Sequence, residues 1–268
     1  MAHLVITGAS AGIGRAAVVG LATDFSRITI VGRDRSRHAP VLTDLATRGV
    51  RTALVECDLG SLRQVAAAAS AIRTTAEPVD VLIANAGVGG QRGITEDGFE
   101  IHFGINHLAH HLLVTELADR ITDRVVVVSS NAHHDSKGLD LATVQRRTPS
   151  LTGLREYRDS KLANVLAGRE ASRRFGFKTH IVHPGMTATD IWRRIPWPVR
   201  PLLTRRMATS EEGADTPMWA ATATGLESGG YYARRALRSP SSHALDDGAA
   251  RQLWDKSDAW VESHRRVR

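Results

Sequence analysis

The chain has 268 residues, enough for one large α/β domain with a buried core, and its one cysteine, Cys57, excludes a disulfide framework and indicates a packed thiol. The net charge is +7, but the basic residues are scattered and are not interleaved with aromatic residues, which argues against nucleic-acid binding. No apolar run reaches transmembrane length and Met1 leads directly into the first expected strand, so we expect a cytoplasmic protein without a signal peptide.

Short apolar runs alternate with helical patterns along the chain. Strands are expected at residues 3–7, 28–31, 53–56, 81–84, 125–129 and 180–183. Helices are expected at residues 13–23, 39–48, 62–74, 95–120 and 154–174. This alternation predicts a single-domain Rossmann-like fold, a doubly wound parallel sheet with helices on both faces, over residues 1–268. In such sheets ligands bind beyond the carboxyl ends of the strands.

A glycine-rich turn follows the first expected strand, with the spacing Gly8-x-x-x-Gly12-x-Gly14, and a helical pattern starts at once. Glycine lets the backbone turn tightly and approach a ligand, and a helix N-terminus offers free N–H groups to an anion. The turn therefore predicts a dinucleotide-binding site. The residues expected to bind the cofactor there are Gly8, Ser10, Ala11, Gly12, Ile13 and Gly14.

The end of the second expected strand bears on the choice between NAD and NADP. NAD sites usually place a carboxylate there for the ribose 2′-hydroxyl, but this chain has Gly32 followed by Arg33. A guanidinium suits the extra phosphate of NADP, and Arg15 on the first helix could assist. The residues predict NADP(H), with a solvated surface charge as the alternative for Arg33.

Polar or small residues also follow the third and fourth expected strands. Asp58, followed by Leu59, could accept from the adenine amino group, or it could cap the helix that starts near Ser61. The segment Asn85-Ala86-Gly87 permits close approach of a cofactor. Asn106, inside a long apolar helical pattern, is expected to bond to nearby backbone and to bend the helix around a water.

A tyrosine and a lysine four residues apart follow the fifth expected strand. Tyr157 and Lys161 share one face of a helix, and an ammonium beside a phenol is expected to lower the phenol pKa. Such a tyrosine can exchange a proton with an alcohol or ketone. Ser130, at the end of the fifth strand, is the third member of this set.

The region after the sixth expected strand is rich in proline, tryptophan and arginine. Its first residues could hold a carboxamide, and those expected to bind the cofactor are Pro184, Gly185, Met186, Thr187 and Thr189. Residues 187–210 are expected to form a substrate lid, with Trp192 and Trp197 against a lipophilic substrate; packing against the body and a membrane-surface patch are the alternatives. His133 and His134 could line the same pocket or merely pack. No metal site is expected, because no H-E-x-x-H pattern or cysteine partner exists.

Together these motifs resemble the short-chain dehydrogenase/reductase superfamily. The matching residues are Thr7-Gly8-x-x-x-Gly12-x-Gly14, Asn85-Ala86-Gly87, Asn106, Ser130, Tyr157-x-x-x-Lys161 and Pro184-Gly185. A narrower resemblance points to the retinol dehydrogenase-like and WW-domain oxidoreductase-like branch. It is carried by residues 106–110, 129–134, 160–166, 183–185, 230–232 and 253–257, and by the long gap between Ser130 and Tyr157.

The resemblance implies a role for each candidate catalytic residue. Tyr157 is the general acid, Lys161 lowers the tyrosine pKa and binds the nicotinamide ribose, and Ser130 bonds the substrate oxygen. Asn106 holds a water in a proton relay toward Lys161. In this pattern the second serine of the pair is catalytic, so Ser129 is not chosen.

These inferences predict an NADP(H)-dependent oxidoreductase that reduces a ketone or aldehyde, or oxidises the alcohol, on a lipophilic small molecule. A C=C reductase and a non-catalytic NADP-sensing or scaffold protein are the alternatives. The resemblance also implies a homodimer or homotetramer that pairs through the helices carrying Asn106 and Tyr157. Substrate, stereochemistry and physiological direction do not follow from the sequence.

Overall fold

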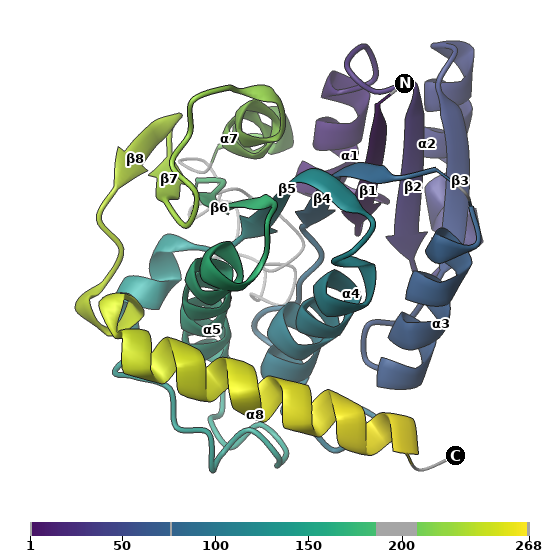
Figure 1. Ribbon diagram of the computed structural model, residues 1–268. Coiled ribbons are helices and arrows are strands. Elements are labelled where there is room, and N and C mark those ends of the chain that lie inside the picture. Colours follow the sequence, from purple (N-terminus) through teal and green to yellow (C-terminus); the bar gives the residue numbers. More distant parts are fainter. Residues whose placement is uncertain (1, 76, 186–207, 267–268) are drawn as a thin grey trace, which may run out of the picture.

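A single eight-stranded sheet forms the centre of the computed structural model, which describes residues 2–75, 77–185 and 208–266 (Figure 1). Its strand order is β3-β2-β1-β4-β5-β6-β7-β8. The strands are β1 (His3–Thr7), β2 (Arg27–Gly32), β3 (Arg51–Glu56), β4 (Val79–Ala84), β5 (Ile121–Val128), β6 (Lys178–His183), β7 (Tyr231–Ala233) and β8 (Ala236–Arg238). All neighbours pair in parallel except β7 and β8, which are antiparallel.

The strand order places the glycine turn at the point where the winding of the sheet reverses. From β1 the chain winds outward to β2 and β3, and then returns to β4 on the other side of β1. The loops after β1 and β4 therefore diverge at one edge and leave room for a ligand. The doubly wound sheet predicted from the sequence is confirmed, with β8 added as an antiparallel edge strand.

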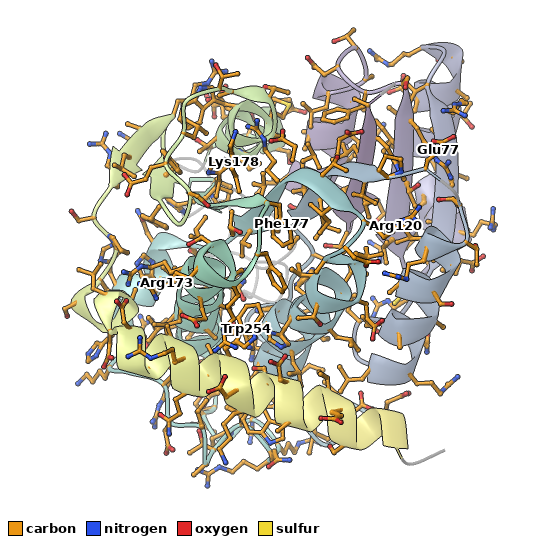
Figure 2. The ribbon with its side chains drawn as sticks, viewed as in Figure 1. Glu77, Arg120, Arg173, Phe177, Lys178 and Trp254 are labelled. Atoms are coloured by element: carbon orange, nitrogen blue, oxygen red, sulfur yellow. The ribbon has the colours of Figure 1, made fainter. Side chains whose placement is uncertain are left out.

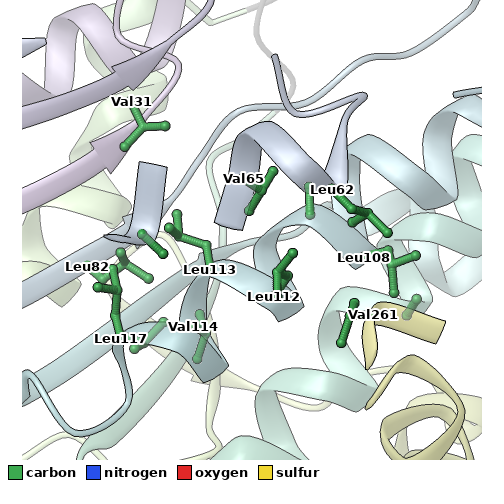
Figure 3. Packing of buried hydrophobic residues seen from close by; sticks show 14 of the residues in the cluster. Val31, Leu62, Val65, Leu82, Leu108, Leu112, Leu113, Val114, Leu117 and Val261 are labelled. Carbon is green, nitrogen blue, oxygen red and sulfur yellow. The ribbon is translucent and has the colours of Figure 1, made fainter. Parts of the chain in front are cut away.

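Helices cover both faces of the sheet. One apolar cluster unites Leu4, Ile28 and Ile83 with the helices of the first face, and the other unites Val5, Leu82 and Val125 with those of the second. The first face carries α1 (Gly12–Gly20), α2 (Arg35–Thr47) and α7 (Ser210–Thr222). The second carries α3 (Leu62–Arg73), a π-helix at Phe103–Leu108, α4 (Ala109–Leu117), α5 (Leu154–Arg174) and α8 (Asp247–Arg266). Figure 3 shows the second cluster, with leucines of α4 packed against Leu62 and Val65 of α3.

Two helices begin elsewhere than the sequence predicts, and capping explains both. Asp34 accepts hydrogen bonds from the backbone N–H groups of Ser36 and Arg37, so α2 starts four residues before the predicted start at residue 39. The helix predicted at 95–120 begins only at residue 101, because the Glu100 carboxylate accepts from the N–H groups of His102 and Phe103. Residues before Glu100 form a turn instead.

The C-terminal helix α8 was not predicted as an element, and it lies across α5, α4 and α3 (Figures 1 and 2). Its apolar stripe, which includes Leu253, Trp254 and Val261, is buried. The Trp254 ring lies 4.5 Å from the His111 ring, centroid to centroid. The helices predicted to pair two copies of the chain are therefore already covered by α8 on this face.

No helix within residues 2–75, 77–185 and 208–266 has both the length and the apolar character needed to cross a membrane. Cys57 is buried in the second cluster, and burial raises the pKa of its thiol to about 12. The packed thiol predicted from the sequence is thus confirmed.

Candidate active site

The glycine turn between β1 and α1 has no room for side chains. Gly8 and Gly12 have φ angles of 73° and 57°, which favour glycine. A Cβ atom on Gly14 would lie 2.1 Å from the carbonyl oxygen of Gly8, and one on Gly8 would lie 2.8 Å from the Cβ of Ala86. The turn thus presents bare backbone and packs directly against the segment that follows β4.

The N-terminus of α1 is open to an anion. The N-cap residue, Ala11, has no side-chain capping bond, and the first turn contains no acidic residue. Ser10, Ala11, Gly12 and Ile13 are all partly exposed along the rim of the turn. Free N–H groups and the positive end of a helix dipole form a cradle that fits the pyrophosphate of a dinucleotide.

At the end of β2, the space beside Gly32 is filled by His38 from the first turns of α2. A Cβ atom on Gly32 would lie 2.4 Å from the Cε1 of His38, so a side chain at residue 32 would require the imidazole to move. The Arg33 side chain is exposed and makes no hydrogen bond or ion pair with a residue in the described part of the chain. A cation without a carboxylate partner among the described residues therefore lies at this strand end, and Arg15 is exposed on the first turn of α1.

Asp58 and Leu59 follow β3 as expected, but Asp58 does not cap α3. Its Oδ1 atom accepts from the N–H of Gly60 at 2.9 Å, and the Ser61 hydroxyl caps the helix by accepting from the N–H of Gln64. Both Asp58 and Leu59 are partly exposed. Capping, offered as the alternative role of Asp58, is therefore wrong, and the proposed contact with adenine stays a prediction.

The segment Asn85-Ala86-Gly87 ties the two halves of the site together. The Asn85 amide donates to the carbonyl oxygens of Thr7 and Gly8 at 2.9 and 3.0 Å. A Cβ atom on Gly87 would lie 3.1 Å from Asn106 Oδ1 and 3.6 Å from Lys161 Nζ. The segment consequently lies between the glycine turn and the candidate catalytic residues.

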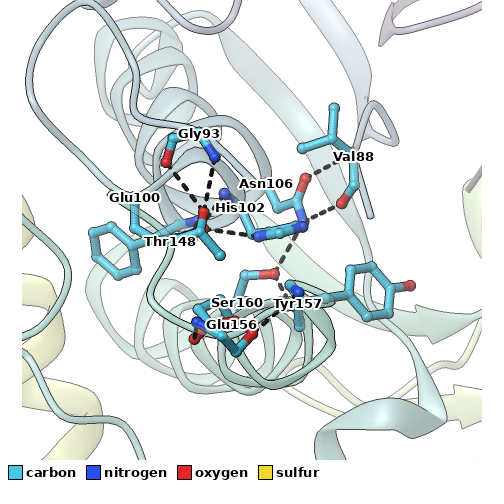
Figure 4. A network of polar contacts seen from close by, with 12 residues as sticks. Val88, Gly93, Glu100, His102, Asn106, Thr148, Glu156, Tyr157 and Ser160 are labelled. Carbon is cyan, nitrogen blue, oxygen red and sulfur yellow. Dashed lines mark hydrogen bonds and ion pairs between the residues drawn. The ribbon is translucent and has the colours of Figure 1, made fainter. Parts of the chain in front are cut away.

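Asn106 lies within the π-helix at Phe103–Leu108 and is fully buried. Its Oδ1 accepts from Val88 N–H at 2.7 Å, and its Nδ2 donates to Val88 carbonyl oxygen and to Ser160 Oγ, as Figure 4 shows. The expected bond to local backbone is wrong, since the side chain reaches a distant loop and α5. The irregular turn agrees with the expected bend, because π-turns widen a helix locally. The predicted water stays a prediction.

Ser130 and Tyr157 are brought together although they are far apart in the sequence. The Ser130 hydroxyl lies close enough to the Tyr157 phenol to lower its pKa, against the raising effect of burial. Ser129 points elsewhere, with its Oγ donating to Lys161 carbonyl oxygen at 2.8 Å. The geometry therefore separates the two serines, with Ser130 beside the phenol and Ser129 holding α5.

Lys161 is buried beside Tyr157, and its Nζ lies 5.8 Å from the centre of the phenol ring. The ammonium donates to Val128 carbonyl oxygen at 3.1 Å, and burial lowers the Lys161 pKa to about 8. Burial raises the pKa of Tyr157, while Ser130 acts in the opposite direction. The predicted lowering of the Tyr157 pKa is wrong for this arrangement, since the ammonium faces the Val128 carbonyl oxygen.

Replacing Lys161 by methionine is expected to stabilise the fold while it removes the candidate ammonium. Lowering a lysine pKa from 10.5 to about 8 costs about 3 kcal/mol of folding free energy wherever the folded lysine is charged. Because the unfolded chain binds more protons between pH 8 and 10.5, wild-type stability should rise with pH across that window. Urea unfolding at pH 7 should show Lys161→Met to be more stable by about 1–3 kcal/mol.

The control for this prediction is Lys178→Met, which removes an exposed lysine from β6 and should change stability by less than about 0.5 kcal/mol. A Lys161→Met protein that is less stable than wild type at pH 7, or that keeps the rise in stability above pH 8, would contradict the cost assigned to burial.

The histidines expected in the substrate pocket differ in their surroundings. His133 is fully buried; its Nδ1 donates to Ser130 carbonyl oxygen at 2.7 Å and its Nε2 accepts from Ser241 N–H at 3.1 Å. Burial lowers its pKa to about 4, so it is neutral and supports the Ser130 backbone. Of the two alternatives given for His133, its burial favours packing. His134 is exposed, and its ring lies 4.1 Å from that of His133.

Only part of the expected nicotinamide and lid region lies within the described residues. Pro184 and Gly185 follow β6, are partly exposed, and Gly185 has a φ of 92°. Met186, Thr187, Thr189, Trp192 and Trp197 lie outside the described residues, as does almost all of the predicted lid.

A cavity of about 250 Å³ lies beside the N-terminal half of α5. The segment between Ser130 and Tyr157 supplies much of its wall, including Leu139 and Val144. Ser130, Tyr157 and Lys161 do not line it, so we do not assign the reacting substrate to this cavity.

Thr7 and His110 join the site, although the sequence assigns neither of them a role in it. Thr7 Oγ1 accepts from the N–H groups of Asn85 and Ala86, and it also bonds to His110 Nε2. The sequence shows His110 and His111 side by side in an apolar helical pattern. The role of His110 depends on its contact with Thr7 of β1, which that pattern does not reveal. In the described ranges, His, Cys, Asp and Glu side chains do not gather in groups that could hold a metal.

Comparison with known proteins agrees with this arrangement. Residues 2–139 match the family model described as short chain dehydrogenase. The provisionally named daunorubicin C-13 ketoreductase DnrU of Streptomyces sp. (strain C5) is 34% identical over 96% of this chain and 92% of its own. Human retinol dehydrogenase 14 is 34% identical over 96% of this chain and 85% of its own.

A solved structure extends the likeness to the whole fold. An uncharacterized protein from Mycobacterium paratuberculosis superimposes with a TM-score of 0.82 and 28% identity, covering 98% of this chain and 94% of the other. The family model covers the glycine turn, and the relatives extend the likeness over nearly the whole chain. The chain therefore belongs to the short-chain dehydrogenase/reductase family of oxidoreductases, which use nicotinamide cofactors, and to its retinol dehydrogenase-like branch.

Proposed function

We propose that this protein is an NADP(H)-dependent oxidoreductase that reduces a ketone or aldehyde on a lipophilic small molecule, or oxidises the corresponding alcohol. The observation that carries the proposal is the grouping of Ser130 and Lys161 around the Tyr157 phenol, with Lys161 Nζ 5.8 Å from the ring centre and on the same helix as Tyr157. This group faces the loop after β4, which packs on the glycine turn. A proton donor and a dinucleotide cradle thus share one edge of the sheet.

Tyr157 acts as the general acid in the reduction. Burial raises its pKa, so the phenol keeps its proton until a carbonyl oxygen begins to accept charge. Ser130 offers a second polar contact to the same oxygen. The Lys161 ammonium, charged below about pH 8, is held beside the phenol by the Val128 carbonyl oxygen and would bind the nicotinamide ribose. When bound, the nicotinamide cofactor supplies the hydride.

Arg33 and Gly32 favour NADP over NAD. The guanidinium is exposed at the end of β2 and is available for a phosphate, while residue 32 is a glycine with His38 packed beside it. Asp34, the next acid along the chain, is engaged as the cap of α2, and Glu56, opposite Gly32 on β3, pairs with Arg35. The preference for NADP therefore rests on the Arg33 guanidinium at the end of β2 and on the lack of a carboxylate at residue 32.

The names of the relatives support a lipophilic substrate. One is named for the C-13 ketone of daunorubicin and another for retinol, both largely apolar molecules. Trp192 and Trp197 follow the Pro184-Gly185 turn in the sequence and suit an apolar ring. The cytoplasmic location and the assembly state stay predictions.

The test is a turnover screen of the purified protein with NADPH and lipophilic ketones, aldehydes and enones. Loss of NADPH absorbance with formation of an alcohol supports the proposal. A saturated carbonyl product from an enone would establish the C=C reductase instead. Tight NADPH binding without turnover of any carbonyl or alcohol would favour the sensing or scaffold protein.

A further inference from the structure

His110 of α4 is buried between the end of β1, where the glycine turn starts, and the π-helix that carries Asn106. It is 6% exposed, and it bonds to Thr7 at the end of β1 and to Asn106 one helical turn earlier. Its Nε2 lies 2.8 Å from Thr7 Oγ1 and its Nδ1 lies 3.0 Å from Asn106 carbonyl oxygen.

The hydrogen-bond network places the protons of this histidine. Asn106 carbonyl oxygen can only accept, so His110 Nδ1 carries the proton that it donates. Thr7 Oγ1 already accepts from the N–H groups of Asn85 and Ala86, at 3.0 and 2.9 Å. Its own proton therefore goes to His110 Nε2, which must be unprotonated. Burial agrees with this, since it lowers the His110 pKa to about 4.

The loop after β4 is consequently held at both ends by one helix. Asn106 binds the N–H and carbonyl groups of Val88, and His110 acts through Thr7 on the N–H groups of Asn85 and Ala86. The residues between these anchors lie against Gly8 and near Lys161 Nζ. A shift of this loop would therefore alter both the glycine turn and the surroundings of the Lys161 ammonium.

We propose that His110 is a positioning residue that, through Thr7, fixes the loop at residues 85–88 against the glycine turn and so sets the affinity for the nicotinamide cofactor. The proposal rests on the NADP(H)-dependent function given above. His110 acts through its hydrogen bonds to Thr7 and Asn106 and not through contact with cofactor or substrate.

Two substitutions separate these bonds. In His110→Gln the amide oxygen can take the place of Nε2 and accept from Thr7, whereas in His110→Asn the amide nitrogen can take the place of Nδ1 and bond only Asn106. His110→Phe removes both bonds. Thr7→Val removes the hydroxyl, and Thr7→Ser keeps it. His111→Asn is the matched control, because His111 is a buried neighbour that bonds Asp258 of α8 instead.

NADPH dissociation constants, KM and kcat for a reactive ketone, and thermal stability should be measured for each protein. His110→Asn, His110→Phe and Thr7→Val should each weaken NADPH binding about tenfold, while His110→Gln and Thr7→Ser stay within about threefold of wild type. The double variant Thr7→Val/His110→Asn should bind no more weakly than Thr7→Val alone, because both remove one interaction. His111→Asn should keep the wild-type dissociation constant.

Hydrogen exchange of the amides at residues 85–88 provides a readout that does not depend on the cofactor. Exchange there should accelerate in His110→Asn and His110→Phe, with residues 112–117 of α4 unchanged. Variants that lose thermal stability but keep wild-type NADPH affinity and exchange would overturn the proposal and leave a purely structural role. A wild-type protein that binds no NADP(H) would refute the proposed function, and the exchange experiment would then decide the role of His110.

Discussion

Tyr157→Phe is expected to lower kcat by about 10²–10⁴-fold while the NADPH dissociation constant changes by less than about threefold. The substitution removes only the phenol oxygen, the atom that lies beside Ser130 and donates the proton to the carbonyl. The ring, which is partly exposed and packs edge-on against His102, is retained. Steady-state kinetics with a ketone, and a fluorescence titration with NADPH, measure the two effects separately.

Tyr232→Phe is the matched control. The Tyr232 phenol donates a hydrogen bond to the Glu227 carbonyl oxygen and not to a candidate catalytic residue. The variant should keep wild-type kcat. Undiminished turnover by Tyr157→Phe would rule out Tyr157 as the general acid. Loss of NADPH binding together with turnover would instead show that the phenol mainly holds the cofactor.

Arg33→Ala is expected to weaken NADPH binding by about 10–100-fold, because one charge-assisted contact to a phosphate is worth about 1.5–3 kcal/mol. NADH affinity should change by less than about twofold, since NADH lacks that phosphate. Arg33 is exposed and unpaired among the described residues, so the fold should keep its stability. Parallel titrations with the two nucleotides give the ratio that decides the role.

Arg48→Ala serves as the control, because Arg48 is an equally surface-lying arginine that pairs with Asp44 at the far end of α2. It carries the same change in net charge, so it separates local contact from a general electrostatic effect. Equal losses of NADPH and NADH affinity in Arg33→Ala would show that the guanidinium does not bind the 2′-phosphate.

The strands could be predicted from the sequence because each contains a short, mainly apolar run. β1 was placed at its observed bounds, and the other predicted strands overlap β2 to β6. Burial on both faces of a parallel sheet imposes that pattern on the residues themselves. β7 and β8 are three residues each, too short for any periodic pattern to be visible.

The helix that carries Asn106 was harder to predict. Its apolar pattern runs on without interruption, so nothing local marks the start after Glu100 or the π-turn at Phe103–Leu108. Glu100 holds the helix start together with Thr148, a residue of the long segment before α5. Such a cap depends on a partner 48 residues away, which periodicity cannot reveal.

By itself, the sequence determined the doubly wound sheet, the glycine turn and the spacing of Tyr157 and Lys161, because each depends on neighbouring residues or on a repeating pattern. The tertiary structure alone decided that burial raises the Tyr157 pKa and that Ser129 bonds the Lys161 carbonyl oxygen. It also decided that His110 joins Thr7 to Asn106. These outcomes depend on desolvation and on contacts between distant strands and helices, which arise only when the chain packs.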